Sequence, residues 1–223
     1  MPAVLARLVI LLALLSGAAQ AQQAQFPIKD DDGAPMANHA LRPDQMAEIA
    51  HLPGLVDVGR PDADVTLYQF YDLNCPYCRE AAADVDTMIR SDPRLRLVFA
   101  PYAVLSPASV EGARVELALR QIGTPQQFLE FHRRIYSGRG RIDGNRALAV
   151  AQSLGFDRRA LTEIADTRPI TDTLTIHAKV GFDAKLMVTP SYVIQGVAIL
   201  GHPGLESLRH VIASVRHCGA VVC

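Results

Sequence analysis

Cys75 and Cys78 are separated by two residues. Of all residues in the chain, they are the ones whose type and spacing most directly suggest a catalytic function. They follow an apolar, strand-like run at 65–71 and open a helix-like run at 79–90. A thiol at a helix N-terminus lies beside unsatisfied backbone N–H groups and the positive end of the helix dipole. This environment stabilises the thiolate, which is the nucleophile in thiol chemistry. The position therefore predicts a redox-active pair.

The order of the two cysteines predicts their roles. Cys75 precedes the helix and is expected to be the more exposed, so it is the candidate nucleophile that forms a mixed disulfide with a substrate. Cys78 lies one turn inside the helix and is the candidate resolving thiol. Pro76 suits the first turn, because its ring presets the helical φ angle and no N–H is needed there. Tyr77 is expected on the rim of an exposed apolar groove around Cys75.

A metal site is the alternative interpretation of the same motif. Zinc would need two further ligands, which Cys218, Cys223, His217 and His210 could in principle supply. The strand–motif–helix context favours a redox pair over a zinc site, and thiol exchange requires no bound cofactor. A CxxC protein that handles Cu(I) or Zn(II) is therefore kept as a rival from another functional class.

The N-terminus predicts export from the cytosol. Arg7 is followed by an apolar run at 8–15, then by small residues and Ala19-Gln20-Ala21. This pattern is typical of a signal peptide at 1–21 that is cleaved near Ala21, and an uncleaved membrane anchor is the alternative. No second apolar segment approaches spanning length, so the mature protein is not expected to be embedded in a membrane. We expect a periplasmic location, where disulfides persist.

Composition and cysteine count further limit the class of protein and the partners to be expected. The chain has 223 residues, 49% of them hydrophobic and 20% charged, and its net charge of −1 does not favour nucleic acid as a partner. Four cysteines in an exported chain fit two disulfides, although sequence alone does not determine their connectivity. Cys218 and Cys223 are the candidates for a local structural disulfide in a C-terminal tail at 218–223.

The hydrophobic patterns predict a small sheet with helices on both faces. An N-terminal arm at 22–52 precedes it and carries a short helix. Between the third and fourth strands, a helical block at about 105–186 is too long for an ordinary connection and should pack as a subdomain. Strands are expected at 55–58, 65–71, 95–100, 191–194 and 197–200, and helices at 43–52, 79–90, 108–122, 125–136, 144–154, 158–165, 170–186 and 205–217.

Two sequence runs carry a resemblance to a known family. Phe70-Tyr-Asp-Leu-Asn-Cys-Pro-Tyr-Cys-Arg79 and Val188-Thr-Pro-Ser-Tyr-Val-Ile194, with the export signal and the helical block, resemble the DsbA-like branch of the thioredoxin superfamily. The resemblance covers roughly 55–217. It implies an α/β thioredoxin-like fold over 53–217, with a central mixed sheet flanked by helices and an inserted helical subdomain.

The resemblance also implies a cis-proline opposite the cysteines. In similar proteins, a cis-proline begins the strand that faces the CxxC motif, and here this position is Thr189-Pro190. Such a proline removes one backbone donor and leaves the backbone of Thr189 free to pair with an extended substrate peptide. An ordinary trans proline at the start of a strand is the alternative.

Three positions depart from the pattern of the family's strong oxidases. Gln69 stands where many relatives carry a buried carboxylate, and the nearby Asp72 is expected to be an exposed loop residue rather than its substitute. Tyr77 stands where strongly oxidising members carry histidine. Thr189 before the proline resembles isomerases and reductases more closely. Thiol–disulfide exchange remains the prediction, whereas its direction stays open.

These features together predict a periplasmic thiol–disulfide oxidoreductase of oxidase-like direction, with a disulfide isomerase or reductase as the alternative. Its substrates would be unfolded or cysteine-containing exported proteins. The resemblance implies a membrane redox partner. We expect a monomer, because the segment 22–52 is short for a dimerisation domain. A chaperone that binds unfolded chains without exchanging disulfides is a second rival.

Overall fold

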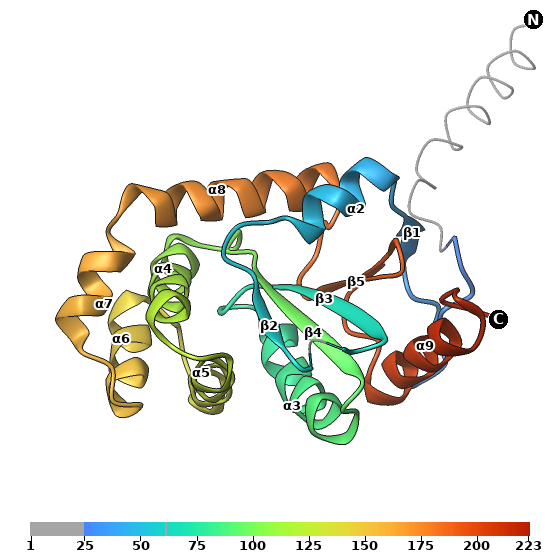
Figure 1. The fold of residues 1–223 in the computed structure, drawn as a ribbon, viewed down its shortest axis with the longest axis horizontal. Helices are drawn as coiled ribbons and strands as arrows, with labels where there is room; N and C mark the ends of the chain where they lie inside the picture. The colour runs from blue at the N-terminus through green and yellow to red at the C-terminus, as the bar shows by residue number, and fades with distance from the viewer. Residues whose placement is uncertain (1–24, 61) are drawn as a thin grey trace, which may run out of the picture.

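A six-stranded mixed sheet forms the centre of the computed structural model, which describes residues 25–60 and 62–223 (Figure 1). The predicted signal peptide at 1–21 lies outside these residues. The strand order is β1-β6-β5-β3-β4-β2. Strands β3 and β4 run parallel, and the other neighbouring pairs are antiparallel. The strands are β1 (Asn38–Ala40), β2 (Val56–Val58), β3 (Val65–Tyr71), β4 (Leu95–Pro101), β5 (Ser191–Ile194) and β6 (Val197–Leu200).

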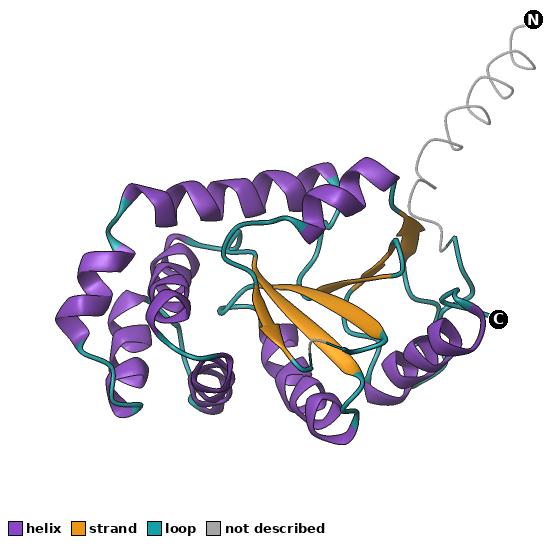
Figure 2. Cartoon of the chain, in the orientation of Figure 1, coloured by secondary structure: helices purple, strands orange, loops and turns teal. Residues whose placement is uncertain are grey.

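Helices cover both faces of this sheet, as the sequence pattern predicted (Figure 2). Helices α3 and α9 pack on one face, and α2 and α8 pack on the other. Helices α4 to α7 lie beyond one side of the sheet (Figure 1). The helices are α2 (Pro43–Ala50), α3 (Pro76–Ser91), α4 (Pro107–Ile122), α5 (Pro125–Ser137), α6 (Gly144–Ser153), α7 (Arg158–Ala165), α8 (Arg168–Asp183) and α9 (Leu205–Cys218).

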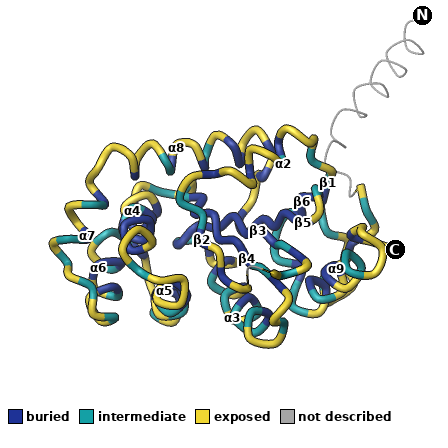
Figure 3. Tube along the Cα trace, viewed as in Figure 1, coloured by how far each residue is buried: buried dark blue, intermediate teal, exposed yellow. Residues whose placement is uncertain are grey.

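Strand β3 is buried on both faces, which explains its nearly continuous apolar sequence. Because successive side chains of a strand point to opposite faces, Leu67 and Tyr71 join the core under α3. Tyr68 and Phe70 join the core under α2 and α8. The central strand therefore leads from the interior of the fold to the CxxC motif. Figure 3 shows this buried centre inside an exposed shell of helices.

Helices α4 to α7 each begin at a capping residue that the sequence supplies. Ser106, Thr124, Asp143 and Asp157 each accept a hydrogen bond from a backbone N–H in the first turn of the helix that follows. A separate core cluster joins α4 to α8. We propose that these helices form the inserted subdomain, and the division of the chain at about 105–186 stays a prediction.

Strand β1 is the element that the sequence patterns missed. It has three residues, Asn38–Ala40, and pairs with β6 at one edge of the sheet. Such a short, polar strand shows no alternation of apolar and polar residues that could be detected in the sequence. It is recognised as a strand because it is hydrogen-bonded to β6. The predicted hairpin is present, with Gln195 and Gly196 both at positive φ between β5 and β6, as a two-residue hairpin turn requires. Among the described helices, none has the length and apolar character needed to cross a bilayer.

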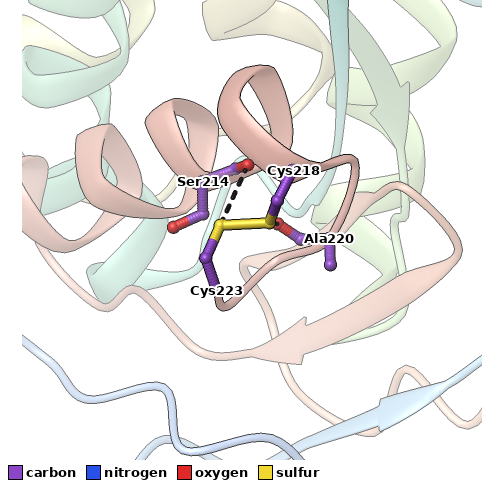
Figure 4. Close-up of a disulfide and its surroundings, with 4 residues drawn as sticks. All are labelled: Ser214, Cys218, Ala220 and Cys223. Atoms are coloured by element: carbon purple, nitrogen blue, oxygen red, sulfur yellow. Dashed lines mark hydrogen bonds between the residues drawn. A yellow bond between two sulfur atoms is a disulfide. The ribbon is translucent and has the colours of Figure 1, made fainter.

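The C-terminal tail is held by a disulfide between Cys218 and Cys223 (Figure 4). Both cysteines are exposed, and the Sγ atom of Cys223 lies 3.4 Å from the carbonyl oxygen of Ser214 in α9. Val221, inside the closed loop, is buried in the core beside α9. The short loop thus fastens the end of the chain to the final helix.

Candidate active site

The CxxC motif lies where strand β3 passes into helix α3. Cys75 is the N-cap residue of the helix and Pro76 is its first residue. The N–H of Cys75 donates to the carbonyl oxygen of Asp72 (3.0 Å), and its own carbonyl oxygen accepts from the N–H of Arg79 (3.2 Å). The thiol of Cys75 therefore faces the free N–H groups of the first turn, where a thiolate is stabilised.

The segment Thr189-Pro190, which directly precedes β5, faces this thiol. The Thr189–Pro190 peptide bond is cis, the isomer that the family resemblance implied. The thiol of Cys75 donates to the carbonyl oxygen of Thr189 at 3.0 Å. Residues that are 114 positions apart in the sequence are thus brought into direct contact.

Both cysteines are buried, and Cys75 is slightly the more exposed of the two, as expected. Cys75 is 4% exposed and Cys78 is 1% exposed. The contact with Thr189 accounts for the burial of Cys75, because the proline-bearing strand lies against its sulfur. Tyr77, between the two cysteines, is 64% exposed, in agreement with its expected place on the rim.

The two thiols differ in pKa because their surroundings differ. The pKa of Cys75 is lowered to about 6, mainly by a hydrogen bond from Cys78 and also by Thr189 and the backbone N–H groups of Tyr77 and Cys78, while burial opposes the shift. Burial raises the pKa of Cys78 far above its usual value, and the neighbouring Cys75 adds to this effect. At neutral pH, Cys75 is mostly thiolate and Cys78 is a thiol.

Asp72 is buried, so the expectation that it is an exposed loop residue is wrong. Its carboxylate accepts hydrogen bonds from the backbone N–H groups of Asn74 (2.8 Å), Val104 (2.9 Å) and Leu105 (3.0 Å). A buried carboxylate is tolerated when such donors surround it. Asp72 therefore holds the loop at 104–105 close to the CxxC turn.

Several exposed apolar side chains belong to segments that contact the CxxC turn. Val104 and Leu105 are held there by Asp72, Val188 directly precedes Thr189, and Tyr77 belongs to the motif itself. All four are exposed, as is the neighbouring Met187. An exposed group of large apolar side chains next to a reactive thiol is suited to contact apolar peptide segments.

Glu116 is a buried carboxyl group that the sequence patterns missed. It lies on α4, and neither of its oxygens completes a hydrogen bond within the described part of the chain. Burial raises its pKa to about 8, the nearby hydroxyl of Tyr71 opposes the shift, and the charge of Asp72 adds to it. The available signal was its position three or four residues from Gly112 and Ala113, on the buried face of the helix.

Two buried histidines and the half-buried His202 differ in their partners. Both ring nitrogens of His177 contact carbonyl oxygens, of Pro101 (2.8 Å) and Pro53 (2.6 Å), so both are satisfied in the core. His132 is buried among aromatic rings, and burial lowers its pKa to about 3. His202 contacts Tyr192 and Asp84, a link that no sequence spacing indicated.

The zinc ligands considered from sequence are not brought together with the CxxC motif. Cys218 and Cys223 are bonded to each other. Within residues 25–60 and 62–223, no group of three or more histidine, cysteine or acidic side chains is arranged to hold a metal ion.

A family model described as thioredoxin matches residues 52–214. The chain belongs to the thioredoxin family. This match confirms the predicted thioredoxin-like fold and the family resemblance. No curated protein matches the sequence.

Solved structures from three bacteria share the fold. A thioredoxin-like oxidoreductase from Silicibacter pomeroyi DSS-3 is 28% identical, with a TM-score of 0.67 over 74% of this chain and 94% of that chain. The thiol-disulfide exchange protein alpha-DsbA2 from Wolbachia pipientis is 18% identical, with a TM-score of 0.68 over 77% and 96%. A periplasmic thioredoxin-like protein from Salmonella enterica serovar Typhimurium is 21% identical, with a TM-score of 0.64 over 80% and 98%. These similarities show a shared fold, and the DsbA-like branch within the family stays a prediction.

The acidity of Cys75 should depend on Cys78. In the reduced protein, the rate of alkylation of Cys75 should reach half its maximum near pH 6. Replacement Cys78→Ala removes the largest stabilising hydrogen bond and should move this midpoint upward, toward that of an ordinary thiol. Cys78→Ser keeps an O–H donor and is the matched control, with a midpoint closer to wild type. Equal midpoints in the alanine variant and the wild type would contradict this account.

Glu116 should make stability fall as pH rises. Its folded pKa of about 8 lies above its ordinary value of 4.5, so the folded state binds a proton more tightly than the unfolded state. This contribution is fully present below about pH 4.5 and is lost as pH rises through about 8, with an upper limit of about 5 kcal/mol. Denaturant unfolding at several pH values should show Glu116→Gln to be progressively more stable than wild type across this window. A constant difference between the two proteins would refute the assignment.

Proposed function

We propose that this protein is a periplasmic thiol–disulfide oxidoreductase that exchanges disulfides with unfolded or cysteine-containing exported proteins. The observation that carries the proposal is the acidified thiol of Cys75 at the N-terminus of α3, in contact with the carbonyl oxygen of Thr189 before a cis-proline. In this proposal Cys75 is the nucleophile and Cys78 is the resolving thiol. Pro76, Tyr77, Thr189 and Pro190 shape their surroundings.

The proposed reaction moves electrons between sulfur atoms and needs no cofactor. A substrate thiolate attacks Cys75 in the oxidised pair, the Cys75–Cys78 bond breaks, and Cys78 leaves and takes up a proton. A second substrate thiolate then attacks the substrate sulfur of the mixed disulfide. The substrate is oxidised to a disulfide, and Cys75 leaves as a thiolate.

Substrate recognition would use the backbone of Thr189 and the apolar rim. The buried Cys75 would be reached by an extended chain that pairs with the backbone of Thr189, just before β5, as in strand addition. The exposed side chains of Tyr77, Leu105 and Val188 would contact apolar residues of that chain. Unfolded proteins present such extended apolar segments, whereas folded proteins bury them.

The acidity of Cys75 favours an oxidase-like direction of intermediate strength. Stabilising the thiolate stabilises the reduced enzyme and makes its disulfide more oxidising. A pKa of about 6 lies between those of thioredoxin, about 7, and DsbA, about 3.5. Tyr77, which cannot carry a positive charge, is consistent with this intermediate position.

The location and partners follow from the predicted leader. Export through a signal peptide cleaved near Ala21 would place the enzyme in the periplasm, where a membrane redox partner would reoxidise it or reduce it. We propose that the mature protein acts as a monomer.

Replacement Cys75→Ser should abolish both insulin reduction and oxidation of dithiol peptides, because it removes the nucleophile. Cys218→Ser with Cys223→Ser is the control and should leave both activities near wild type, because this pair lies in the tail. Retained exchange in Cys75→Ser would overturn the proposal. Suppression of aggregation that survives Cys75→Ser, without exchange in the wild type, would favour the chaperone. Stoichiometric metal after anaerobic purification, without exchange, would favour the metal-handling rival.

The reduction potential of the Cys75–Cys78 pair should lie between about −270 mV, the value for thioredoxin, and about −120 mV, the value for DsbA. The physical reason is the intermediate acidity of Cys75. Equilibration with glutathione buffers of known ratio measures the potential. A value at or below that of thioredoxin would refute the oxidase-like direction and favour a reductase.

A further inference from the structure

The connection between α5 and α6, residues 138–143, lies beside the CxxC motif. Asn74, which directly precedes Cys75, holds this connection by two hydrogen bonds. Its side chain donates to the carbonyl oxygen of Ile142 (2.8 Å) and accepts from the N–H of the same residue (2.7 Å). Only the side chain of Asn74 therefore separates the backbone of the connection from the CxxC turn.

Arg79 holds the same connection from the other end of the motif. It directly follows Cys78, and its N–H donates to the carbonyl oxygen of Cys75 (3.2 Å). Its guanidinium donates to the carbonyl oxygens of Gly138 and Gly140, the latter at 3.5 Å. The connection thus contacts the residue on each side of the cysteine pair, so its position relative to the two cysteines is fixed.

Four arginines gather at this connection, and we call them the arginine cluster. Arg139 and Arg141 belong to the connection itself, Arg79 reaches it from α3, and Arg146 reaches it from α6. The guanidinium of Arg146 donates to the carbonyl oxygen of Arg139. Side chains from two helices therefore bring their charges to the segment that carries the two other arginines.

Carboxylates do not neutralise the arginine cluster. Of the eighteen arginines at 25–60 and 62–223, twelve have a carboxylate oxygen within 4.0 Å, and the cluster contains four of the other six. The side chains of Arg139 and Arg141 are exposed and make no hydrogen bond within these residues. Their guanidinium groups are therefore free to bind an anion.

Three solvent-accessible acidic residues lie near the cluster, and none of them forms an ion pair with it in the described part of the chain. Glu111 and Asp143 accept hydrogen bonds from backbone N–H groups at the start of α6, at 3.4 and 2.9 Å. Glu80, on α3, is exposed. These acids partly offset the positive charge of the cluster but leave its two exposed guanidinium groups without a partner.

We propose that the arginine cluster selects substrates that carry acidic side chains next to the reactive cysteine. This inference rests on the proposed function. The apolar rim is uncharged and can contact any apolar segment, whereas guanidinium groups attract carboxylates and bind them by paired hydrogen bonds. A substrate chain whose cysteine reaches Cys75 lies within reach of the long side chains of Arg139 and Arg141, because the connection is fixed beside the motif.

The cluster would act on the encounter with the substrate and not on the exchange itself. Ion pairs that remain exposed to water are individually weak, so two of them change the choice among substrates without dominating their affinity. Charges at the edge of a site act mainly on the rate of association, and salt screens them. The expected signature is therefore a rate that depends on the charge of the substrate and on ionic strength.

Three dithiol peptides that differ only in the two residues beside the first cysteine test this inference. One carries two aspartates, one two serines and one two lysines. At low ionic strength, the oxidised mature protein should oxidise the acidic peptide roughly three- to tenfold faster than the neutral one, and the basic peptide should be the slowest. Acid quenching and chromatography measure the rates. The preference should fade between about 0.01 M and 1 M salt, because the Debye length shortens from about 30 Å to about 3 Å.

Substitutions of the two exposed arginines should remove or invert the preference. Arg139→Gln with Arg141→Gln should bring the three rates together, and Arg139→Glu with Arg141→Glu should make the basic peptide the fastest. Arg159→Gln with Arg168→Gln is the matched control, because it removes the same net charge from α7 and α8, where these side chains are 88% and 90% exposed. The control should keep the wild-type preference.

Equal rates for the three peptides in the wild type would overturn the inference while leaving the proposed function intact. A preference that survives Arg139→Gln with Arg141→Gln, or that the control loses equally, would place the charge elsewhere and also overturn it. A uniform fall of all three rates in the glutamine variant would assign these arginines a structural role and reject the selection. Absence of exchange with every peptide would refute the proposed function, and the inference with it.

Discussion

The geometry of the site depends on the hydrogen bonds that the buried carboxylate of Asp72 accepts. It accepts three backbone N–H groups, one from the CxxC turn and two from the loop after β4. Its carbonyl oxygen also accepts from the N–H of Cys75 and from the hydroxyl of Tyr136 in α5. One residue therefore joins the end of β3, the start of α3 and the helical block. An apolar residue there would leave several buried donors unpaired, which is costly.

The chemistry then follows from the different surroundings of two identical side chains. Cys75 lies at the end of α3, where backbone N–H groups and Cys78 stabilise its charge. Cys78 lies one turn further on, where burial opposes any charge. The strand after the cis-proline lies against the sulfur of Cys75, so the side of the thiol that a substrate can approach is restricted. The helix supplies the reactivity and the opposing strand limits the access.

Much of the fold could be predicted from sequence, because periodicity and capping residues are local. The cysteine spacing, the run before Pro190 and the helical block pointed to the correct family. Features that depend on contacts between residues far apart in the sequence could not be predicted. Asp72 looked like a loop residue because its partners at 104–105 come from another strand end. His202 looked isolated because Asp84 is 118 positions away. Strand β1 exists only because β6 pairs with it.

The depth of Cys75 below the surface has a consequence for timing. A cysteine residue that is 4% exposed can exchange a disulfide only with a chain flexible enough to reach its sulfur. Under the proposed function, a newly exported protein would meet this requirement while it is still mobile and would lose the ability as its own core forms. The substrates of such an enzyme are therefore chosen by their folding rate as much as by their sequence. Proteins that fold slowly remain available, and those that fold quickly escape.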